Sequence, residues 1–285
     1  MNNVICEAGK SEKLTTFLNP VSMARNLYRH RSLIKQFAWR DFVSRYKGSF
    51  LGVFWSFITP LMMLAVYAFV FSVIFKSKWN VKTDQSQIDF ALTLFCGLTV
   101  FNIFAEAVTR APALILAYPN YVKKVVFPLE VLPVAALGTS LLNAAVSLVI
   151  LLVAQLIVSQ TISMTIVLFP LVLIPLCAAT LGITWFLSSL GVFIRDIGQA
   201  VGVLVTILLF VSGVFFPPTA VPKEFSFLVQ LNPLVSMLEE SRRTLMWGLY
   251  PDWEWLLSAC IGSIVIMMLG YAWFMRTKKA FADVI

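Results

Sequence analysis

The residues of this sequence that could take part in chemistry are few, and most lie in or beside apolar segments. Glu106 and Arg110 are four residues apart, so on a helix they share one face and are expected to form an intramembrane ion pair. The sequence has no H-E-x-x-H, G-x-S-x-G or C-x-x-C motif, which are patterns of zinc proteases, serine hydrolases and metal or redox sites. We therefore predict no catalytic residue, no metal site and no enzyme activity in this chain.

A nucleotide site is also not expected. Gly9-Lys10-Ser11 resembles the end of a phosphate-binding loop, but Val4 occupies the position where that loop needs its first glycine. Isolated carboxylates deep in the apolar segments, which proton-driven carriers use, are missing. The chain is thus expected to bind no cofactor itself, and any work that it performs would use energy from a partner protein.

Composition places these residues in a membrane protein. The chain has 285 residues, of which 59% are hydrophobic and 13% charged, whereas soluble domains are roughly 45–50% apolar and about 25% charged. This balance excludes a soluble enzyme or a nucleic-acid-binding domain, although the net charge is +8. A span needs ~20 mostly apolar residues, and six segments qualify: 51–75, 90–109, 131–158, 165–194, 198–216 and 255–275.

The distribution of Lys and Arg predicts the orientation. With a cytoplasmic amino end, sixteen of the 22 Lys and Arg residues fall on the cytoplasmic side, as the positive-inside rule requires. We expect a multi-pass membrane protein with both termini in the cytoplasm. The expected fold is an all-α integral membrane protein with three parts: a cytoplasmic segment with an amphipathic interface helix (1–50), a six-helix transmembrane domain (51–275) and a cytoplasmic tail (276–285).

Three further segments are patterned but do not span. Residues 21–47 alternate apolar and basic side chains near helical spacing, which suits a helix in the membrane interface that anchors the chain or contacts a cytoplasmic partner. Residues 111–130 are broken by Pro112, Pro119 and Pro128, and form either a connector or a docking loop. Residues 217–249 are too apolar for a free loop and too interrupted to span, so we predict a re-entrant pair of half-helices on the outer side.

Aromatic residues are candidates for a glycan conduit, because sugar rings stack on aromatic faces. The first and fifth predicted spans carry several such residues, although any one of them could instead face lipid or a neighbouring helix. The candidate channel residues are Trp55, Phe57, Tyr67, Phe71, Phe210, Phe215 and Phe216.

The opening of the first span matches a known pattern. Arg40-Asp41-Phe42-Val43-Ser44-Arg45-Tyr46-Lys47, followed by Leu51-Gly52-x-x-Trp55 and Thr59-Pro60-Leu61, resembles ABC-2 type permeases that export polysaccharides, and most closely their O-antigen and teichoic acid branch. Later motifs, Leu231-Asn232-Pro233-Leu234 and Glu239-x-x-Arg242, are similar to the re-entrant region that ABC-2 permeases share. The resemblance covers nearly the whole chain.

This resemblance implies an assembly and a substrate. Similar proteins are homodimers that work with two ATP-binding subunits, which carry the ATP and Mg²⁺. It implies coupling to the ATPase through the interface helix and through Pro119, Asn120, Tyr121, Lys123 and Lys124. It also implies export of a glycan on an undecaprenyl diphosphate carrier, for which Arg40, Arg45 and Lys47 are candidate contacts if they do not bind the partner.

Other functions stay open at this point. An ABC-2 exporter of teichoic acid, capsule, a drug or an ordinary lipid would share most of these features. A membrane enzyme acting on polyprenyl lipids would need carboxylate clusters that the chain lacks, and a structural anchor would not need a proline-broken re-entrant segment.

Overall fold

A computed structural model describes residues 19–74, 87–123, 127–160, 163–225, 227 and 231–285. Within these ranges the regular elements are helices, without strands. The α-helices are α2 (Pro20–Arg29), α3 (Arg31–Ser44), α4 (Trp55–Tyr67), α5 (Gln87–Leu114), α6 (Pro119–Val122), α7 (Val131–Ser159), α8 (Phe169–Phe193), α9 (Ile197–Val211), α11 (Pro233–Leu245), α12 (Trp253–Thr277) and α13 (Phe281–Val284).

Five helical segments are long and apolar enough to cross a membrane: Gly52–Phe71, Ile88–Leu114, Val131–Ser159, Met164–Phe193 and Trp253–Val284. They correspond to five of the six predicted spans. The other, predicted over 198–216, is the shorter helix α9 of 15 residues, which at ~1.5 Å per residue reaches only about 22 Å. It ends early because Gly213, with φ +66°, turns the chain after Ser212.

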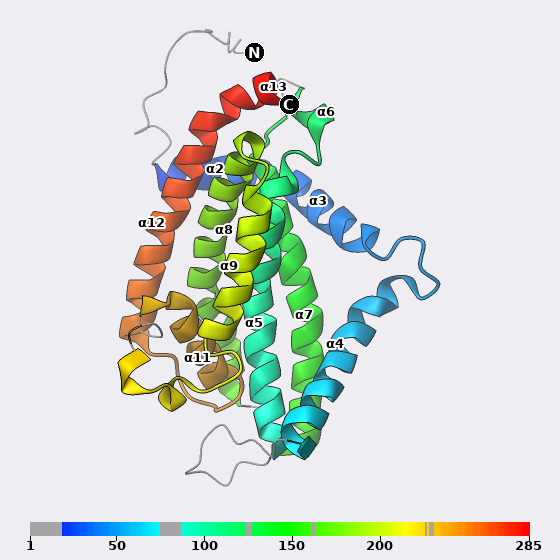
Figure 1. Cartoon of the computed structure of the whole chain (residues 1–285), viewed down its shortest axis with the longest axis vertical. Helices are drawn as coiled ribbons and strands as arrows, with labels where there is room; N and C mark the ends of the chain where they lie inside the picture. Colours follow the sequence, from blue (N-terminus) through cyan, green and yellow to red (C-terminus); the bar gives the residue numbers. More distant parts are fainter. Residues whose placement is uncertain (1–18, 75–86, 124–126, 161–162, 226, 228–230) are drawn as a thin grey trace.

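Helix α5 forms the centre of the bundle (Figure 1) and contacts α7, α8, α9 and α11. Most of its apolar side chains are buried, among them Phe95, Val100 and Ile103. A helix that is apolar around most of its circumference is stable only when other helices surround it. Beside it, α8 and α12 cross closely at Gly182 and Gly270, where a side chain on Gly270 would meet the carbonyl oxygen of Gly182 at 2.0 Å.

The predicted interface helix over 21–47 is two helices rather than one. They meet at His30, and α2 and α3 run across the long helices rather than along them (Figure 1). Asn19 caps α2 by accepting hydrogen bonds from the backbone N–H groups of Val21 and Ser22. The apolar side of α3, with Phe37, Ala38 and Phe42 buried, packs against α7.

The two ends of the bundle carry different elements (Figure 1). Helices α2, α6 and α13 lie at one end, the α13 end, which is the predicted cytoplasmic side. Helix α11 lies towards the other, the α11 end, and packs against α5 and α8. This helix lies in the segment 217–249, for which a pair of half-helices is predicted, whereas 226 and 228–230 of that segment lie outside the described residues.

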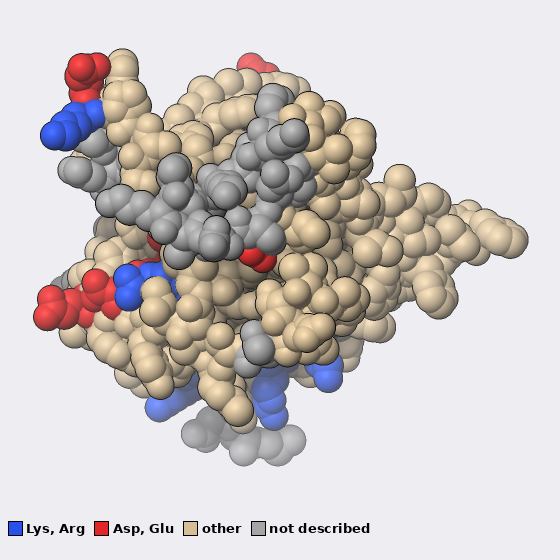
Figure 2. All heavy atoms as spheres, turned by 90° about the horizontal axis from the view of Figure 1, so that it is seen from below, with Lys and Arg blue, Asp and Glu red and all other residues tan. Residues whose placement is uncertain are grey.

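Helix α4 projects from the bundle at an angle (Figure 1), and the 18-residue window that qualifies its segment as a span is only 11% buried. It contains Pro60 and continues as a π-helical segment, Ala68–Ile74. Figure 2 looks onto the α11 end, and the limb that projects at the right shows no Lys, Arg, Asp or Glu in that view.

Candidate functional site between helices α3, α4, α5 and α7

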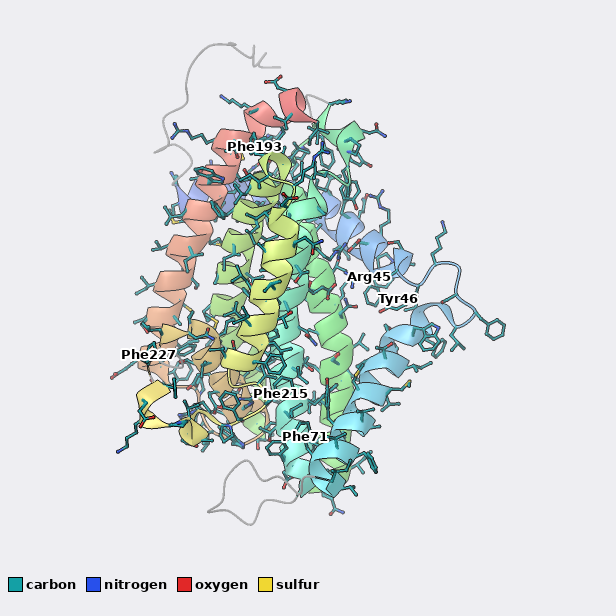
Figure 3. All side chains as sticks on the ribbon, viewed as in Figure 1. Arg45, Tyr46, Phe71, Phe193, Phe215 and Phe227 are labelled. Carbon is teal, nitrogen blue, oxygen red and sulfur yellow. The ribbon has the colours of Figure 1, made fainter. Side chains whose placement is uncertain are left out.

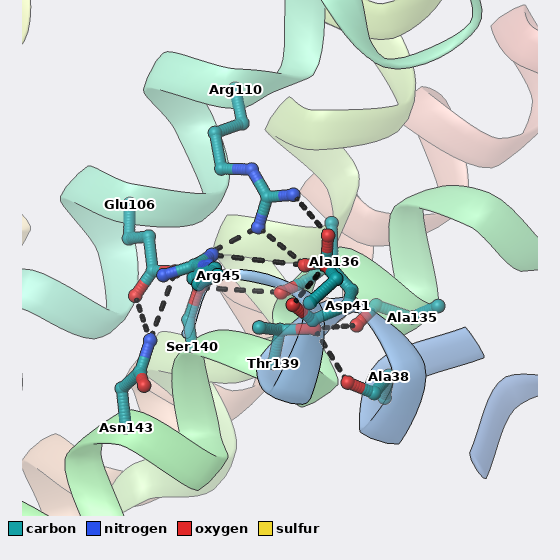
Figure 4. Close-up of polar contacts among 11 residues, drawn as sticks. Ala38, Asp41, Arg45, Glu106, Arg110, Ala135, Ala136, Thr139, Ser140 and Asn143 are labelled. Carbon is teal, nitrogen blue, oxygen red and sulfur yellow. Dashed lines mark hydrogen bonds and ion pairs between the residues drawn. The ribbon is translucent and has the colours of Figure 1, made fainter. Parts of the chain in front are cut away.

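A charged cluster joins helix α3 to helix α5 (Figure 4). Arg110 donates hydrogen bonds to both carboxylate oxygens of Asp41, each at 2.7 Å. Arg45 forms an ion pair with Glu106, and its guanidinium lies 3.7 Å from Asp41. Asn143 of α7 donates to both Glu106 oxygens, at 3.1 and 2.9 Å. The two acids and two bases therefore neutralise one another between α3 and α5, and Asn143 ties them to α7.

The predicted ion pair between Glu106 and Arg110 is thus one part of a larger network. Their charged atoms approach to 3.8 Å, but each residue has a shorter contact with a side chain from α3. Burial alone would raise the pKa of Asp41, but the hydrogen bonds and charge of Arg110, with the charge of Arg45, outweigh it and lower that pKa. Asp41 is therefore ionised at neutral pH.

A polar groove runs from this cluster along α5 and α7. Its first part has a cavity volume of about 500 Å³ and contains Glu106, Arg110 and Ser140. Its second part, about 240 Å³, is covered by Ser56, Thr59 and Tyr67 of α4 and by Tyr46. The two parts share four polar residues of α5 and α7: Thr99, Asn102, Asn143 and Ser147.

The predicted channel aromatics are not gathered at one place. Tyr67 lines the groove, whereas Phe57 lines an apolar pocket with residues of α3 and α7, and Trp55 is exposed. Phe71 packs on Phe90, with ring centroids 5.4 Å apart. At the end of α9, Phe210 stacks on Phe215 at 5.5 Å, and Phe216 is half-buried. Figure 3 shows Phe71 and Phe215 towards the α11 end.

The three basic residues predicted to meet a diphosphate have different surroundings. Arg45 is engaged in the charged cluster, in the angle between α3, α4 and α7 (Figure 3). The Arg40 guanidinium lies 4.5 Å from the ring centroid of Phe37, a cation–π contact. Lys47 is exposed. Of these three residues, Arg45 pairs with the carboxylates of the cluster, whereas Arg40 and Lys47 do not.

The predicted coupling residues lie against the interface helix. Pro119 begins α6, where its fixed φ suits the first helical position, and Asn120 and Lys123 are exposed. The Tyr121 ring packs edge-on against Phe37 of α3, with centroids 5.6 Å apart. Lys124 lies outside the described residues. The two segments expected to meet an ATPase, α3 and α6, therefore contact one another.

Arg242 on α11 is a functional candidate of a different kind. Its side chain is 0% exposed and donates to the carbonyls of Gly213, Val214 and Thr93 at 3.0, 3.0 and 3.3 Å. It also pairs with Glu239 at 2.9 Å. A buried guanidinium is stable only with such partners, so Arg242 joins α11 to α5 and to the chain that follows α9.

A further network at the α13 end was not predicted from the sequence. Lys278 pairs with the buried carboxylate of Glu130 at 2.7 Å, and Asn26 of α2 donates to the same carboxylate at 2.9 Å. Asn26 also donates to the Tyr271 hydroxyl of α12, and Trp185 of α8 donates to the backbone carbonyl of Glu130. These contacts hold α2 against α12 and the start of α7, and hold α8 to the same point at Glu130.

Comparisons with known proteins point to one family. A profile of the ABC-2 type transporter family matches residues 32–246. The chain is 29% identical over 265 residues to the O-antigen export system permease protein RfbA of Myxococcus xanthus, which covers 92% of this chain and 99% of that protein. It is 24% identical over 247 residues to the same-named protein of Klebsiella pneumoniae, an alignment that covers 86% of this chain and 92% of that protein. It is 23% identical over 244 residues to the polysialic acid transport protein KpsM of Escherichia coli, with 85% and 92% covered.

Proposed function

Since the chain belongs to the ABC-2 type transporter family, we propose that it is the membrane permease of an exporter that moves a lipid-linked O-antigen type polysaccharide out of the cytoplasm. One observation carries this proposal: the alignment with an O-antigen export permease extends over 92% of this chain and 99% of that protein. The similarity therefore includes the interface helices, the groove helices and α11, rather than one shared motif.

ABC-2 permeases work with ABC ATP-binding subunits in exporter complexes. For this chain we propose two such subunits, which carry the ATP and Mg²⁺, bound to a homodimer of the permease. Helices α3 and α6 would receive the motion of the ATPase. Phe37 packs on both Tyr118 and Tyr121, so a push on α6 would move α3, and through Asp41 and Arg45 it would reach α5.

The proposed carrier of the glycan is undecaprenyl diphosphate. In the proposed orientation, the α13 end faces the cytoplasm of a bacterial inner membrane, and both termini lie there. Arg40 and Lys47 would then be exposed at the inner leaflet, where basic side chains attract phosphate groups. In a dimer the aromatics of α4 and of the α9 end would line the channel, and α11 would gate its outer mouth.

The test is purification of the chain together with the ATPase encoded beside its gene. We expect a stable complex whose ATP hydrolysis is stimulated by lipid-linked glycan extracted from the source bacterium and not by undecaprenyl phosphate. A chain that copurifies with no ATPase would contradict the proposal. A Tyr121→Ala chain, which lacks the half-buried ring that contacts Phe37, should still bind the ATPase but lose much of the stimulation.

Export of a capsular polysaccharide is the second candidate, and a specific finding favours it. Two polysialic acid transport proteins of Escherichia coli align over 85% of this chain, although at lower identity than the O-antigen permeases. A deletion strain separates the two functions, because the first predicts loss of the surface O-antigen and the second loss of the capsule. Normal amounts of both would favour an exporter of teichoic acid, a drug or an ordinary lipid.

A further inference from the structure

The groove beside α5 and α7 contains many polar side chains, although it lies on helices that qualify as membrane spans. Its lining on α5 extends from Phe95 to Arg110, which is about 22 Å of helix at ~1.5 Å per residue. The hydrocarbon core of a bilayer is ~30 Å thick. Its polar side chains on α5, from Thr99 to Arg110, extend over about 16 Å, which is about half of that thickness.

These polar groups would be costly if lipid covered them. Asn102 and Thr109 are exposed on α5, and within the described part of the chain neither side chain forms a hydrogen bond. An amide facing hydrocarbon without a partner costs on the order of 2–7 kcal/mol. Polar residues at membrane depth usually face a water-filled cavity or a ligand, so the groove is expected to hold molecules that form hydrogen bonds.

The charge of the groove restricts the kind of ligand. Arg45 and Arg110 are both paired with carboxylates, so the groove has no surplus positive charge for a diphosphate. The remaining polar lining consists of amides and hydroxyls, which both donate and accept hydrogen bonds as sugar hydroxyls do. Tyr46 and Tyr67 add aromatic rings at the α4 side, a combination typical of sites that orient a ligand by a few polar groups and apolar faces.

We propose that this groove binds the uncharged sugar residues of the exported glycan, with Asn102 and Ser147 as hydrogen-bonding groups and Tyr67 as a stacking surface. The inference rests on the proposed export function and deepens it, because it adds a sugar-binding surface on α4, α5 and α7 of each subunit to the proposed channel. The diphosphate would bind elsewhere, nearer to Arg40 and Lys47.

Cysteine labelling in the assembled complex with its ATPase tests this proposal. Cys6, Cys177 and Cys260 are first replaced by Ser, and buried Cys96 is kept. In that background Ser147→Cys should react with a charged thiol reagent, and lipid-linked glycan from the source bacterium should slow the reaction several-fold, whereas undecaprenyl phosphate should not. The matched control is Val149→Cys on the same helix, which lines the apolar pocket on the other side of α7 and should not react with the charged reagent, because lipid would cover that pocket.

Two results would overturn the proposal. Labelling that glycan does not slow, in a complex that still exports glycan in cells, would make the groove a water-filled space and leave the export function intact. Absence of labelling in the complex would mean that a second copy or lipid covers the groove. An unlabelled or unprotected site in a complex that exports no glycan at all would instead contradict the proposed function as well.

A second readout uses export in cells. Asn102→Leu should lower the amount of surface glycan several-fold at an unchanged protein level, while Asn102→Gln, which keeps the amide, should restore most of it. Equal export by the leucine and glutamine variants would overturn the proposal, because it would show that the amide contacts nothing that moves through the groove.

Discussion

The arginine on α11 and the arginines of the charged cluster are stabilised by different kinds of partner. Arg242 is fully buried, and its guanidinium donates hydrogen bonds to three backbone carbonyls and pairs with one carboxylate. Arg45 and Arg110 keep side-chain exposures of 30% and 33% and pair with carboxylates from other helices. The first arrangement fixes the backbone at the end of α9, whereas the second joins helices through side chains that can exchange partners.

This difference separates a structural role from a functional one. Carbonyls buried beside Arg242 have no water to replace it, so its loss leaves several groups unsatisfied at once. The cluster has more than one ion pair for each charge and opens into the groove, so losing one contact leaves others. We therefore expect the α11 end to govern stability and the cluster to govern transport.

The largest effect is expected for Arg242→Met. Removing one partner of a buried ion pair typically costs about 3–5 kcal/mol, and here three carbonyls also lose a donor. We expect little folded protein in membranes and a large fall in the thermal midpoint in detergent. The matched control is Arg243→Met. Arg243 is the next residue along the chain, but its side chain is 37% exposed and pairs with Glu240 at 3.7 Å. Equal stability of the two variants would remove the contrast between the two regions.

A smaller effect is expected for Gly97→Ala. A Cβ at this position would meet a guanidinium nitrogen of Arg242 at 2.2 Å, so the arginine must shift away from its carbonyls. Overpacking of this kind costs about 1–3 kcal/mol. Gly262→Ala is the control, since its Cβ would meet nothing within 4 Å and should be neutral or stabilising. A Gly97→Ala protein that melts like the control would show that Arg242 is held loosely.

The charged cluster should give a still smaller effect on stability. For Arg45→Gln and Glu106→Gln, measured singly and together, we expect a coupling energy of about 1 kcal/mol, because both side chains are partly solvated. Export per folded molecule should fall more than stability does. A coupling energy as large as the loss in Arg242→Met, with export unchanged, would assign the cluster a purely structural role.

The smallest effect concerns acidification. Burial opposes ionisation of Glu130, but the charge and hydrogen bond of Lys278, with the hydrogen bond from Asn26, lower its pKa below the ordinary value. A lowered folded-state pKa gives stability that is present above the unfolded pKa of about 4.3 and is lost as pH falls below it. The thermal midpoint should therefore drop more steeply below that pH in the wild type than in Glu130→Gln. Parallel curves would contradict this account.

Much of the bundle follows from local sequence signals. Apolar runs of sufficient length predict five of the spans within a few residues. The prolines that follow Phe216 predict that the fifth apolar run ends there and that the next segment does not span the membrane. The end of α9 is less predictable, because 198–216 is apolar throughout and only the tertiary contacts of Gly213 with Arg242 show where the helix stops.

The candidate site was only partly visible in the sequence. Glu106 and Arg110 are recognisable by their spacing, but their shorter contacts come from α3, a helix far away in the chain. The sequence does contain a pattern that indicates the groove. Polar residues recur at helical spacing within one span (Thr99, Asn102 and Glu106) and within the next (Ser140, Asn143 and Ser147).

Deletion of the gene in the source bacterium tests the central claim most directly. The account predicts that the surface polysaccharide disappears, that its lipid-linked form accumulates on the cytoplasmic face of the inner membrane, and that the wild-type gene restores export. A deletion strain with a normal surface polysaccharide and no accumulated precursor would contradict it.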